Sequence, residues 1–318
     1  MTSEAPHAAE QPLFTHGTGL LRTSVARLPG GGFVWERRPG PAAPEGLAPP
    51  APGLARTVTE AGRSQGVEPA LPTVADPTAT VLRYRLPGAF SAARLLRIPD
   101  PQVPALVTEA LRGTGRLLAA LHTHTPAASL AAPPTGPPSG IRRLRGWLAR
   151  GEGPGDAGRL HRAFVARLGE GRRRRAIEAA DWAGWAGGGA LLHGAPGLGG
   201  LVPSPYAGRG ALLTGEELAV GTPEFDVGWL LGELVELRAA ARLGLGGAPA
   251  HDYAPLARAL LDGYGPARPA PLARAALLRI LTHTHDYAAY VGWHDDLTSY
   301  LDLLAGLVDE DGAPAARW

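Results

Sequence analysis

Apolar and polar residues alternate along the first quarter of the chain, which is the pattern of half-buried β-strands. Two alternating pieces between Phe14 and about Arg38 flank the turn signal Pro29-Gly30-Gly31-Gly32 and predict an antiparallel hairpin. The proline-rich segment 40–53 predicts a loop, Leu54 to Gly66 suits a short helix, and the alternation around 79–88 indicates a strand pair. This part of the chain is expected to be mostly antiparallel β structure.

Beyond Asp100 the apolar positions recur at intervals of three and four, which is the spacing of amphipathic helices. Gln102 to His122 and Phe225 to Arg242 follow this spacing most clearly. Shorter helices are predicted over 141–150, 156–168, 172–185, 254–263, 271–282 and 295–307. Segment 126–140, which is rich in Pro, Ala and Ser, predicts a long loop.

One stretch, Leu191 to Leu231, combines the two patterns. It predicts a strand, a Gly-rich turn, a short strand, a second turn with glycine, a third strand, a loop and then the start of the helix that continues to Arg242. We interpret this stretch as the core around which the rest of the chain is organised.

Composition removes several kinds of chemistry. All 31 basic residues are arginine, so no lysine is present to form a Schiff base or to act as a point charge on phosphate. The absence of cysteine removes disulfides, thiolate nucleophiles and Cys-ligated metals. The 44 glycines and 32 prolines, with abundant alanine, are typical of a GC-rich genome such as that of an actinobacterium.

Charge and hydropathy indicate no nucleic-acid or membrane partner. The formal net charge is only +2, so the pI near 9.2 is not evidence of a nucleic-acid footprint. No apolar run approaches the length that spans a bilayer, and the polar start MTSEAPHAAEQPLF carries no signal segment, which favours the cytoplasm. Residues 1–12 and the last ten residues, DEDGAPAARW, are expected to be tails.

Several of these features together resemble the aminoglycoside phosphotransferase and choline kinase-like families. They are the hairpin and helix, the entry GVEPALP (66–72), the Leu-Pro-Gly at 86–88, His193-Gly194, and the helix-opening GTPEFD at 221–226. The resemblance implies an α+β, two-lobed, protein-kinase-like fold with a small, mostly antiparallel β lobe and a large, mostly α-helical lobe. It implies a disordered tail over 1–12, a small lobe over 13–88, and a large lobe over 89–318 that contains the core 191–231.

The resemblance also places the catalytic positions. Active members carry His-Gly-Asp, four variable residues and then Asn, followed by a second metal-binding Asp seven residues before the helix-opening glycine. Here Ala195 stands for the proton-accepting Asp, Gly200 for the Asn and Thr214 for the second Asp. Because none of these residues supplies a carboxylate, ordinary metal-dependent phosphoryl transfer is expected to be lost.

Other positions are assigned roles by the same resemblance. Gly194, Gly221, Pro223 and Asp226 would form the structural core, with the Asp226 side chain bracing the catalytic loop. Arg37 lies near the position of the strand lysine, and Glu60 near that of the helix glutamate which pairs with it. Arg37 and Glu60 are therefore the candidates for contact with a nucleotide cofactor, although no cofactor is expected for a degenerate site.

Some interpretations stay open at this point. Glu216 and Glu217 could bring a carboxylate back to the metal site, and His193 is a possible acid or base. The pairs His122/His124 and His283/His285 offer four imidazoles, but neighbours two apart on a helix diverge, so bound metal is not the favoured reading. The basic run Arg172-Arg173-Arg174-Arg175 is a candidate partner-binding surface, since cations are unfavourable at a helix N-terminus.

Three functions follow from this interpretation. The favoured one is a pseudokinase, similar to kinase-like proteins of class V lanthipeptide and thioamitide biosynthesis, that binds a ribosomally made precursor peptide or a partner enzyme such as a lyase. In a heteromeric complex it would assist Ser/Thr dehydration or thioether ring formation. The alternatives are an active peptide or small-molecule kinase that uses Glu216 and Glu217, and a non-catalytic nucleotide-binding regulator.

Overall fold

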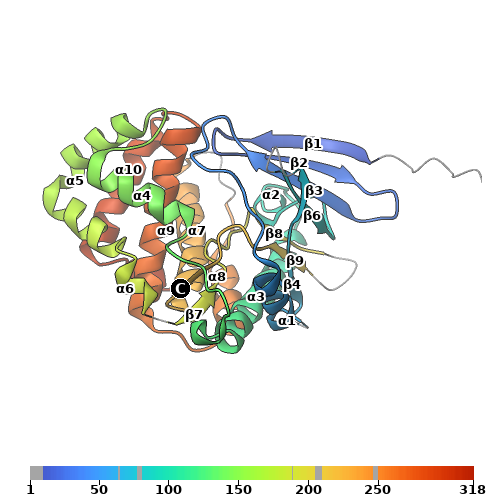
Figure 1. Cartoon of the computed structure of the whole chain (residues 1–318). Helices are drawn as coiled ribbons and strands as arrows, with labels where there is room; N and C mark the ends of the chain where they lie inside the picture. The colour runs from blue at the N-terminus through green and yellow to red at the C-terminus, as the bar shows by residue number, and fades with distance from the viewer. Residues whose placement is uncertain (1–9, 64, 77–80, 188, 205–209, 246–249) are drawn as a thin grey trace, which may run out of the picture.

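The computed structural model describes residues 10–63, 65–76, 81–187, 189–204, 210–245 and 250–318. They form a small lobe built on a β-sheet and a large lobe of helices, which lie beside each other (Figure 1). The predicted α+β class with two lobes is confirmed.

The small lobe is built on a five-stranded antiparallel sheet in the order β1-β2-β3-β6-β5. Its strands are β1 (Gln11–Gly17), β2 (Leu21–Arg27), β3 (Phe33–Pro39), β5 (Thr73–Asp76) and β6 (Val81–Leu86). The predicted hairpin is the β2–β3 pair, and its turn uses Gly31 and Gly32 at φ of 91° and 77°, which glycine adopts readily.

Strand β1 corrects the predicted N-terminal tail. Gln11 and Pro12 belong to this strand and pair with Arg27 and Ala26 of β2. Residues 1–9 of the predicted tail lie outside the described residues.

A second sheet joins the N-terminal part of the chain to the core stretch 191–231. After α1 (Pro52–Ala61), β4 (Val67–Ala70) pairs in parallel with β9 (Gly210–Leu213), and β9 pairs with β8 (Leu201–Val202). The segment before the Leu-Pro-Gly therefore hydrogen-bonds directly to the core stretch.

Two long helices, α7 (Glu224–Leu243) and α9 (Pro269–Tyr290), lie against each other in the large lobe (Figure 1). Gly228 and Gly232 of α7 allow this closeness, since an added Cβ would lie 2.4 Å from the Leu272 carbonyl oxygen and 2.6 Å from that of Ala276. In the same lobe α3 (Val103–His124) packs on α8 (Ala254–Tyr264).

The remaining elements surround this centre: α2 (Ala92–Leu95), η1 (Ala127–Ser129), α4 (Ser139–Arg150), α5 (Ala157–Ala179), α6 (Ala183–Ala186), β7 (Ala190–Leu192), β10 (Ala219–Gly221), α10 (Asp296–Asp309) and η2 (Ala313–Ala316). The two helices predicted over 156–168 and 172–185 correspond mainly to the two halves of α5. A kink at Gly169, with φ of 77° and ψ of 166°, separates them.

The C-terminal residues are folded onto the large lobe, so the predicted C-terminal tail is wrong. Ala315 in η2 is fully buried, and the Trp318 indole donates to the Ala315 carbonyl oxygen at 2.9 Å. The Arg238 guanidinium of α7 lies 4.1 Å from the centre of the Trp318 ring.

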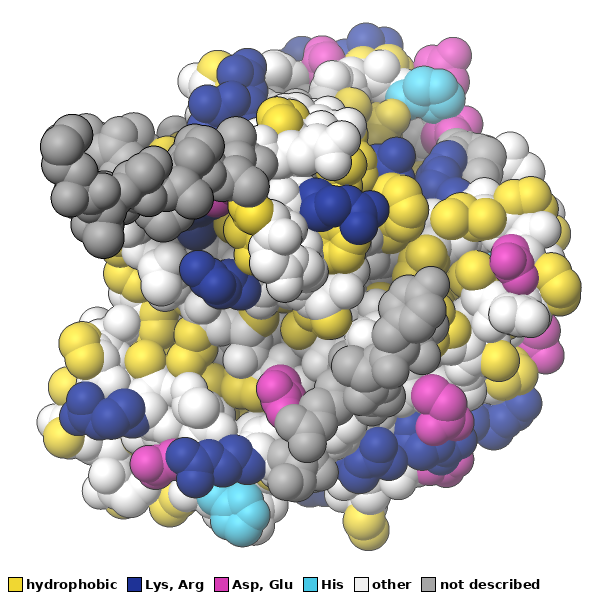
Figure 2. Space-filling view, turned by 90° about the vertical axis from the view of Figure 1, so that its right-hand side faces the viewer, with side chains coloured by type: hydrophobic (Ala, Val, Ile, Leu, Met, Phe, Trp, Pro, Cys, Tyr) yellow, Lys and Arg dark blue, Asp and Glu magenta, His cyan; other side chains and the backbone are white. Residues whose placement is uncertain are grey.

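The view of one face and the composition of the helices bear on possible partners. On the face turned toward the viewer in Figure 2, arginine side chains are dispersed among apolar and acidic ones. Within the described residues, no helix combines the length and apolar character that crossing a bilayer requires.

Candidate functional site

The loop that starts at His193 is held by one buried carboxylate. Asp226, at the start of α7, accepts hydrogen bonds from the backbone N–H groups of His193 at 2.7 Å and Gly194 at 2.9 Å. His122 Nε2 lies 3.0 Å from the same carboxylate, and Asp226 is fully buried. Two backbone contacts to one side chain therefore hold the loop, and His122 of α3 contacts the same carboxylate.

Gly194 itself is required by this geometry. Its φ is 90°, and an added Cβ would lie 1.8 Å from the Glu217 carbonyl oxygen. Gly221 is similarly enclosed, since its Cβ would lie 2.9 Å from Leu192 and 3.3 Å from Trp182. Pro223 directly precedes α7.

Ala195, Gly200 and Thr214 stand at the three expected catalytic positions, and none of them has a charged group that could bind a metal ion. Ala195 and Gly200 line a cavity of about 400 Å³ between the lobes. Thr214 is buried, and its hydroxyl donates to the Leu212 carbonyl oxygen at 2.8 Å. Magnesium prefers carboxylate and phosphate oxygens, so these residues do not fit the metal site of an active kinase.

Glu216 contacts two side chains of the small lobe. Its Oε1 accepts from Arg37 Nη1 at 2.6 Å and from the Tyr84 hydroxyl. Burial and the Glu216 carboxylate raise the pKa of Tyr84 far above its usual range, so Tyr84 stays protonated. Arg37 thus pairs with Glu216, whereas Glu60 lies exposed on α1, and the Arg37–Glu60 pair that the resemblance implied is not observed.

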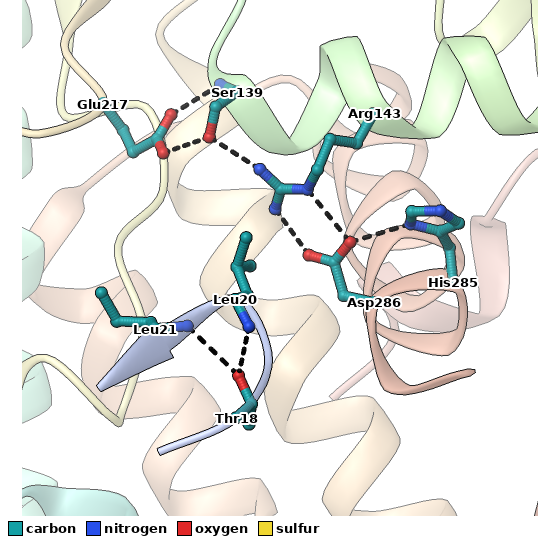
Figure 3. A network of polar contacts seen from close by, with 8 residues as sticks. All are labelled: Thr18, Leu20, Leu21, Ser139, Arg143, Glu217, His285 and Asp286. Atoms are coloured by element: carbon teal, nitrogen blue, oxygen red, sulfur yellow. Dashed lines mark hydrogen bonds and ion pairs between the residues drawn. The ribbon is translucent and has the colours of Figure 1, made fainter. Parts of the chain in front are cut away.

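Glu217 contacts the first residue of α4 instead. Its carboxylate accepts from the Ser139 hydroxyl and from the Ser139 backbone N–H at 2.6 Å. Figure 3 shows how Arg143 continues this network, with Nη1 donating to Ser139 Oγ at 3.0 Å and a bidentate pair to Asp286. His285 contacts Asp286 at the far end. Both carboxylates therefore have partners from distant parts of the chain.

Trp35 fills the space next to the segment that joins the lobes. It lies two residues before Arg37 on the inner face of β3, and its indole N–H donates to the Gly88 carbonyl oxygen at 3.1 Å. The side chain is 3% exposed and belongs to one apolar cluster with Val25 of β2 and Val202 of β8. Trp35 therefore packs with residues of β2 and β8 and is hydrogen-bonded to the backbone at Gly88.

The turn between β1 and β2 is also fastened. The Gly19 N–H donates to the Tyr290 carbonyl oxygen at the end of α9 at 2.8 Å. Gly40 and Ala42 donate back to the carbonyl oxygens of Leu20 and Gly19. One backbone hydrogen bond, from Gly19, therefore joins this turn to the large lobe, and the other two join it to the segment after β3.

His193 is a poor acid or base in this setting. It is buried, and its Nε2 lies 2.8 Å from the Leu213 carbonyl oxygen, so Nε2 carries the hydrogen and donates it. Nδ1 faces the Ala195 N–H at 3.4 Å. Burial lowers the pKa of His193 despite the nearby Asp226 carboxylate, and the imidazole is neutral at neutral pH.

This depressed pKa predicts a loss of stability in mild acid. A histidine whose folded-state pKa lies below its unfolded value of 6.5 binds fewer protons when folded, so its contribution is complete above pH 6.5 and falls as the pH drops below that value. We expect the free energy of unfolding to fall by up to about 1.4 kcal/mol per pH unit from this group. Urea unfolding of wild type and His193→Gln at pH 7.5 and 5.5 measures it.

The comparison isolates His193 because the variant lacks the titrating group. The buried acids Glu236 and Asp286, whose pKa values are lowered, change protonation only at more acidic pH. His16 also has a lowered pKa, from partial burial and from Arg94 and Arg37, and it is retained in both proteins. Equal pH slopes for the two proteins would contradict the assignment.

The histidine pairs are used separately. His122 contacts Tyr264 and Asp226, His283 contacts Glu236, and His285 contacts Asp286. His124 is exposed. No group of three His, Asp or Glu residues within the described part of the chain is arranged to hold a metal ion.

The basic run at 172–175 is largely paired within the molecule. Arg172 and Arg175 contact Asp309 of α10, and Arg173 contacts Glu170. Arg174 is exposed. The run therefore stabilises the contact between α5 and α10 and offers less charge to a partner than its sequence indicates.

Sequence reasoning missed two charged residues that line the interlobe cavity. Glu233 of α7 accepts from the Leu198 N–H at 2.9 Å, and Arg279 of α9 lies 3.8 Å from it. Glu233 follows Asp226 by two helical turns, so helical periodicity alone places both carboxylates on the face turned to the loop. That spacing was a signal that sequence analysis could have used.

Comparison with known proteins gives the fold. No protein-family model matches the chain, and no curated protein matches it. Among solved structures, it is similar to the amicoumacin kinase hAmiN in complex with AMP-PNP, Ca²⁺ and Ami, with a TM-score of 0.54 and 12% identity over 94% of this chain and 88% of that one. It is also similar to LicA in complex with AMP, with a TM-score of 0.51 and 11% identity over 95% of this chain and 93% of that one.

A choline/ethanolamine kinase family protein from Mesorhizobium loti aligns over 98% of this chain and 94% of its own, with 17% identity and a TM-score of 0.48. At 11–12% identity, the likeness to hAmiN and LicA shows the fold alone. The chain has the fold of these two proteins.

Proposed function

We propose that this chain, with its aminoglycoside phosphotransferase-like fold, is a pseudokinase that binds a peptide or a partner enzyme and does not transfer phosphate. In this proposal it assists Ser/Thr dehydration or thioether ring formation on a ribosomally made precursor peptide. The resemblance of the core stretch supports the peptide as the binding partner. The residues of the site support the loss of phosphoryl transfer.

One observation carries the proposal: both carboxylates that could replace the missing ligands have other partners. Phosphoryl transfer requires metal ions that neutralise charge on the transferred group. Glu216 holds Arg37 and Tyr84, and Glu217 holds the N-terminus of α4. Freeing either one would leave a partly buried cation or helix end without its acceptor.

The position of Trp35 argues against the nucleotide-binding alternative. A planar base that entered the cleft beside Gly88 would have to displace a buried indole from its hydrogen bond. Displacement of a well-packed aromatic side chain costs several kcal/mol, which weak ligand contacts do not recover.

We therefore expect no response to ATP. Addition of Mg²⁺ and ATP should leave the melting temperature unchanged, because a ligand raises it only by binding the folded state. Labelled ATP should transfer no phosphate to Ser- and Thr-containing peptides encoded beside the gene, while one of those peptides binds without metal.

The alternatives give different results. Mg²⁺-dependent transfer that is abolished by Glu216→Gln would establish an active kinase with relocated ligands. A rise in melting temperature with ATP, without peptide binding, would favour a nucleotide-binding regulator.

A further inference from the structure

A second hollow lies outside the interlobe cleft, where the β1–β2 turn meets the end of α9. It has a volume of about 550 Å³, and Arg22, Arg38, Thr15, Thr18 and Tyr290 are among the residues that line it. We call it the turn hollow. Residues alternate between the two faces of a strand, so Arg22 and Arg38 lie on the outer face of the sheet, opposite to the inward Thr23 and Arg37.

The two arginines are placed at an electrostatic cost. Arg22 of β2 and Arg38 of β3 are direct partners in the antiparallel ladder, and both are exposed. Like charges opposite each other in a sheet are destabilising, with Cβ atoms only about 5 Å apart. Within the described residues, no ion pair joins either guanidinium to a carboxylate.

The neighbouring cation on the same face is treated differently. Arg83 of β6 faces Glu36, which lies two residues before Arg38 on β3, and its guanidinium pairs with Glu36 at 3.2 Å and with Glu10. Glu36 and Glu10 thus neutralise Arg83, whereas no carboxylate among the described residues pairs with Arg22 or Arg38. An anion from outside would remove the repulsion between them.

The rest of the lining favours an anion as well. Thr18 Oγ1 accepts from the N–H groups of Leu20 at 3.1 Å and Leu21 at 3.4 Å, so its own hydroxyl hydrogen remains to be donated (Figure 3). No Asp or Glu lines the turn hollow. The Gly19 N–H donates to the Tyr290 carbonyl oxygen, so two residues that line the turn hollow are joined by a hydrogen bond and this carbonyl oxygen already has a donor.

The strand beside the turn hollow, β1, indicates which kind of molecule would bind there. β1 is at the edge of its sheet, and its residues are almost all exposed. An edge strand offers unpaired backbone groups to an extended peptide, which binds by adding a strand. β1 ends at Gly17, directly opposite Arg22, and the Arg22 side chain lies so close to Gly17 that an added Cβ would be 2.9 Å from its Cγ.

We propose that the turn hollow binds an acidic segment of the peptide partner, with carboxylates on Arg22 and Arg38 and the peptide backbone along β1. This inference rests on the proposed peptide-binding function and names the chemistry of the segment that is recognised. Guanidinium groups bind carboxylates through paired N–H donors, which gives both charge and direction.

The test uses a short fluorescein-labelled peptide rich in glutamate and measures its binding by fluorescence anisotropy. Each of Arg22→Gln and Arg38→Gln should weaken binding about tenfold, because each removes charge-assisted bonds to a carboxylate. The control is Arg85→Gln, which removes one exposed positive charge from the same sheet outside the hollow. It should change binding by less than about threefold.

Two further measurements keep the outcomes distinct. The melting temperatures of Arg22→Gln and Arg38→Gln should be no lower than that of wild type, since each change relieves repulsion, so weaker binding would not reflect unfolding. A glutamine-rich peptide of the same length should bind more weakly than the glutamate peptide. Equal losses in all three variants, or no loss in any, would overturn the proposal.

The source of the anion is tested by competition. Inorganic phosphate that displaces the peptide completely at the ionic strength of a chloride control would show a simple anion site and overturn the peptide assignment. Failure of the proposed function appears elsewhere, as phosphate transfer or an ATP-dependent thermal shift, and leaves these binding ratios unchanged.

Discussion

Asp226→Ala should lower the free energy of unfolding by about 3–5 kcal/mol, which is the range for removing one member of a buried charged network. The change deprives the N–H groups of His193 and Gly194 of their acceptor and leaves His122 without its carboxylate. Because Asp226 is fully buried, water cannot replace it without reorganisation. Urea unfolding at neutral pH measures the loss.

A matched control is available on α8. Asp262 is 64% exposed at its side chain and contacts Arg112 at the surface, so Asp262→Ala should cost less than about 1 kcal/mol. If the two variants lost similar amounts of stability, Asp226 would not be the brace of the loop that starts at His193.

Trp35→Ala should cost about 3–5 kcal/mol, since it removes a large buried side chain from a close-packed core. The change also leaves the Gly88 carbonyl oxygen without its indole donor. If the surrounding residues hold their positions, the variant contains a slot of indole shape, and an apolar cavity of that kind binds a matching small molecule. Indole should therefore raise the melting temperature of Trp35→Ala and leave wild type unchanged.

Trp35→Phe separates packing from hydrogen bonding at this position. It keeps most of the apolar volume and removes the N–H donor, so it should cost clearly less than Trp35→Ala. A Trp35→Ala protein as stable as wild type would show that the cleft closes without the indole, and would remove this obstacle to a nucleotide.

Local patterns were sufficient to predict much of the fold. The glycine turn at 30–32 and the alternation on each side of it gave the β2–β3 hairpin, and the three- and four-residue spacing gave α3 and α7. These elements are determined by neighbours in the sequence, which is why periodicity finds them.

Elements whose apolar face is interrupted were predicted less well. Helix α9 continues to Tyr290, although the prediction ended it at Thr282. The residues beyond include buried polar side chains with partners of their own: Thr284 donates to the Ile280 carbonyl oxygen, and His285 contacts Asp286. A polar residue that has a partner inside the protein gives the same sequence signal as an exposed one.

The charged contacts of the site could not be predicted from the sequence, for a different reason. Arg37 and Glu216 are 179 residues apart in the chain, and Ser139 and Glu217 are 78 apart. Motif positions identified Ala195, Gly200 and Thr214 as altered. Only the tertiary structure shows that the two neighbouring carboxylates have partners.

The pairing of β4 with β9 has a consequence for the order in which the chain acquires its structure. Val67 finds its partner only at Gly210, so a ribosome must synthesise most of the core stretch before the first quarter of the protein can complete its hydrogen bonds. Contacts between residues so distant in sequence form late and slowly. During synthesis the β lobe is thus an unfinished unit that depends on residues still to emerge.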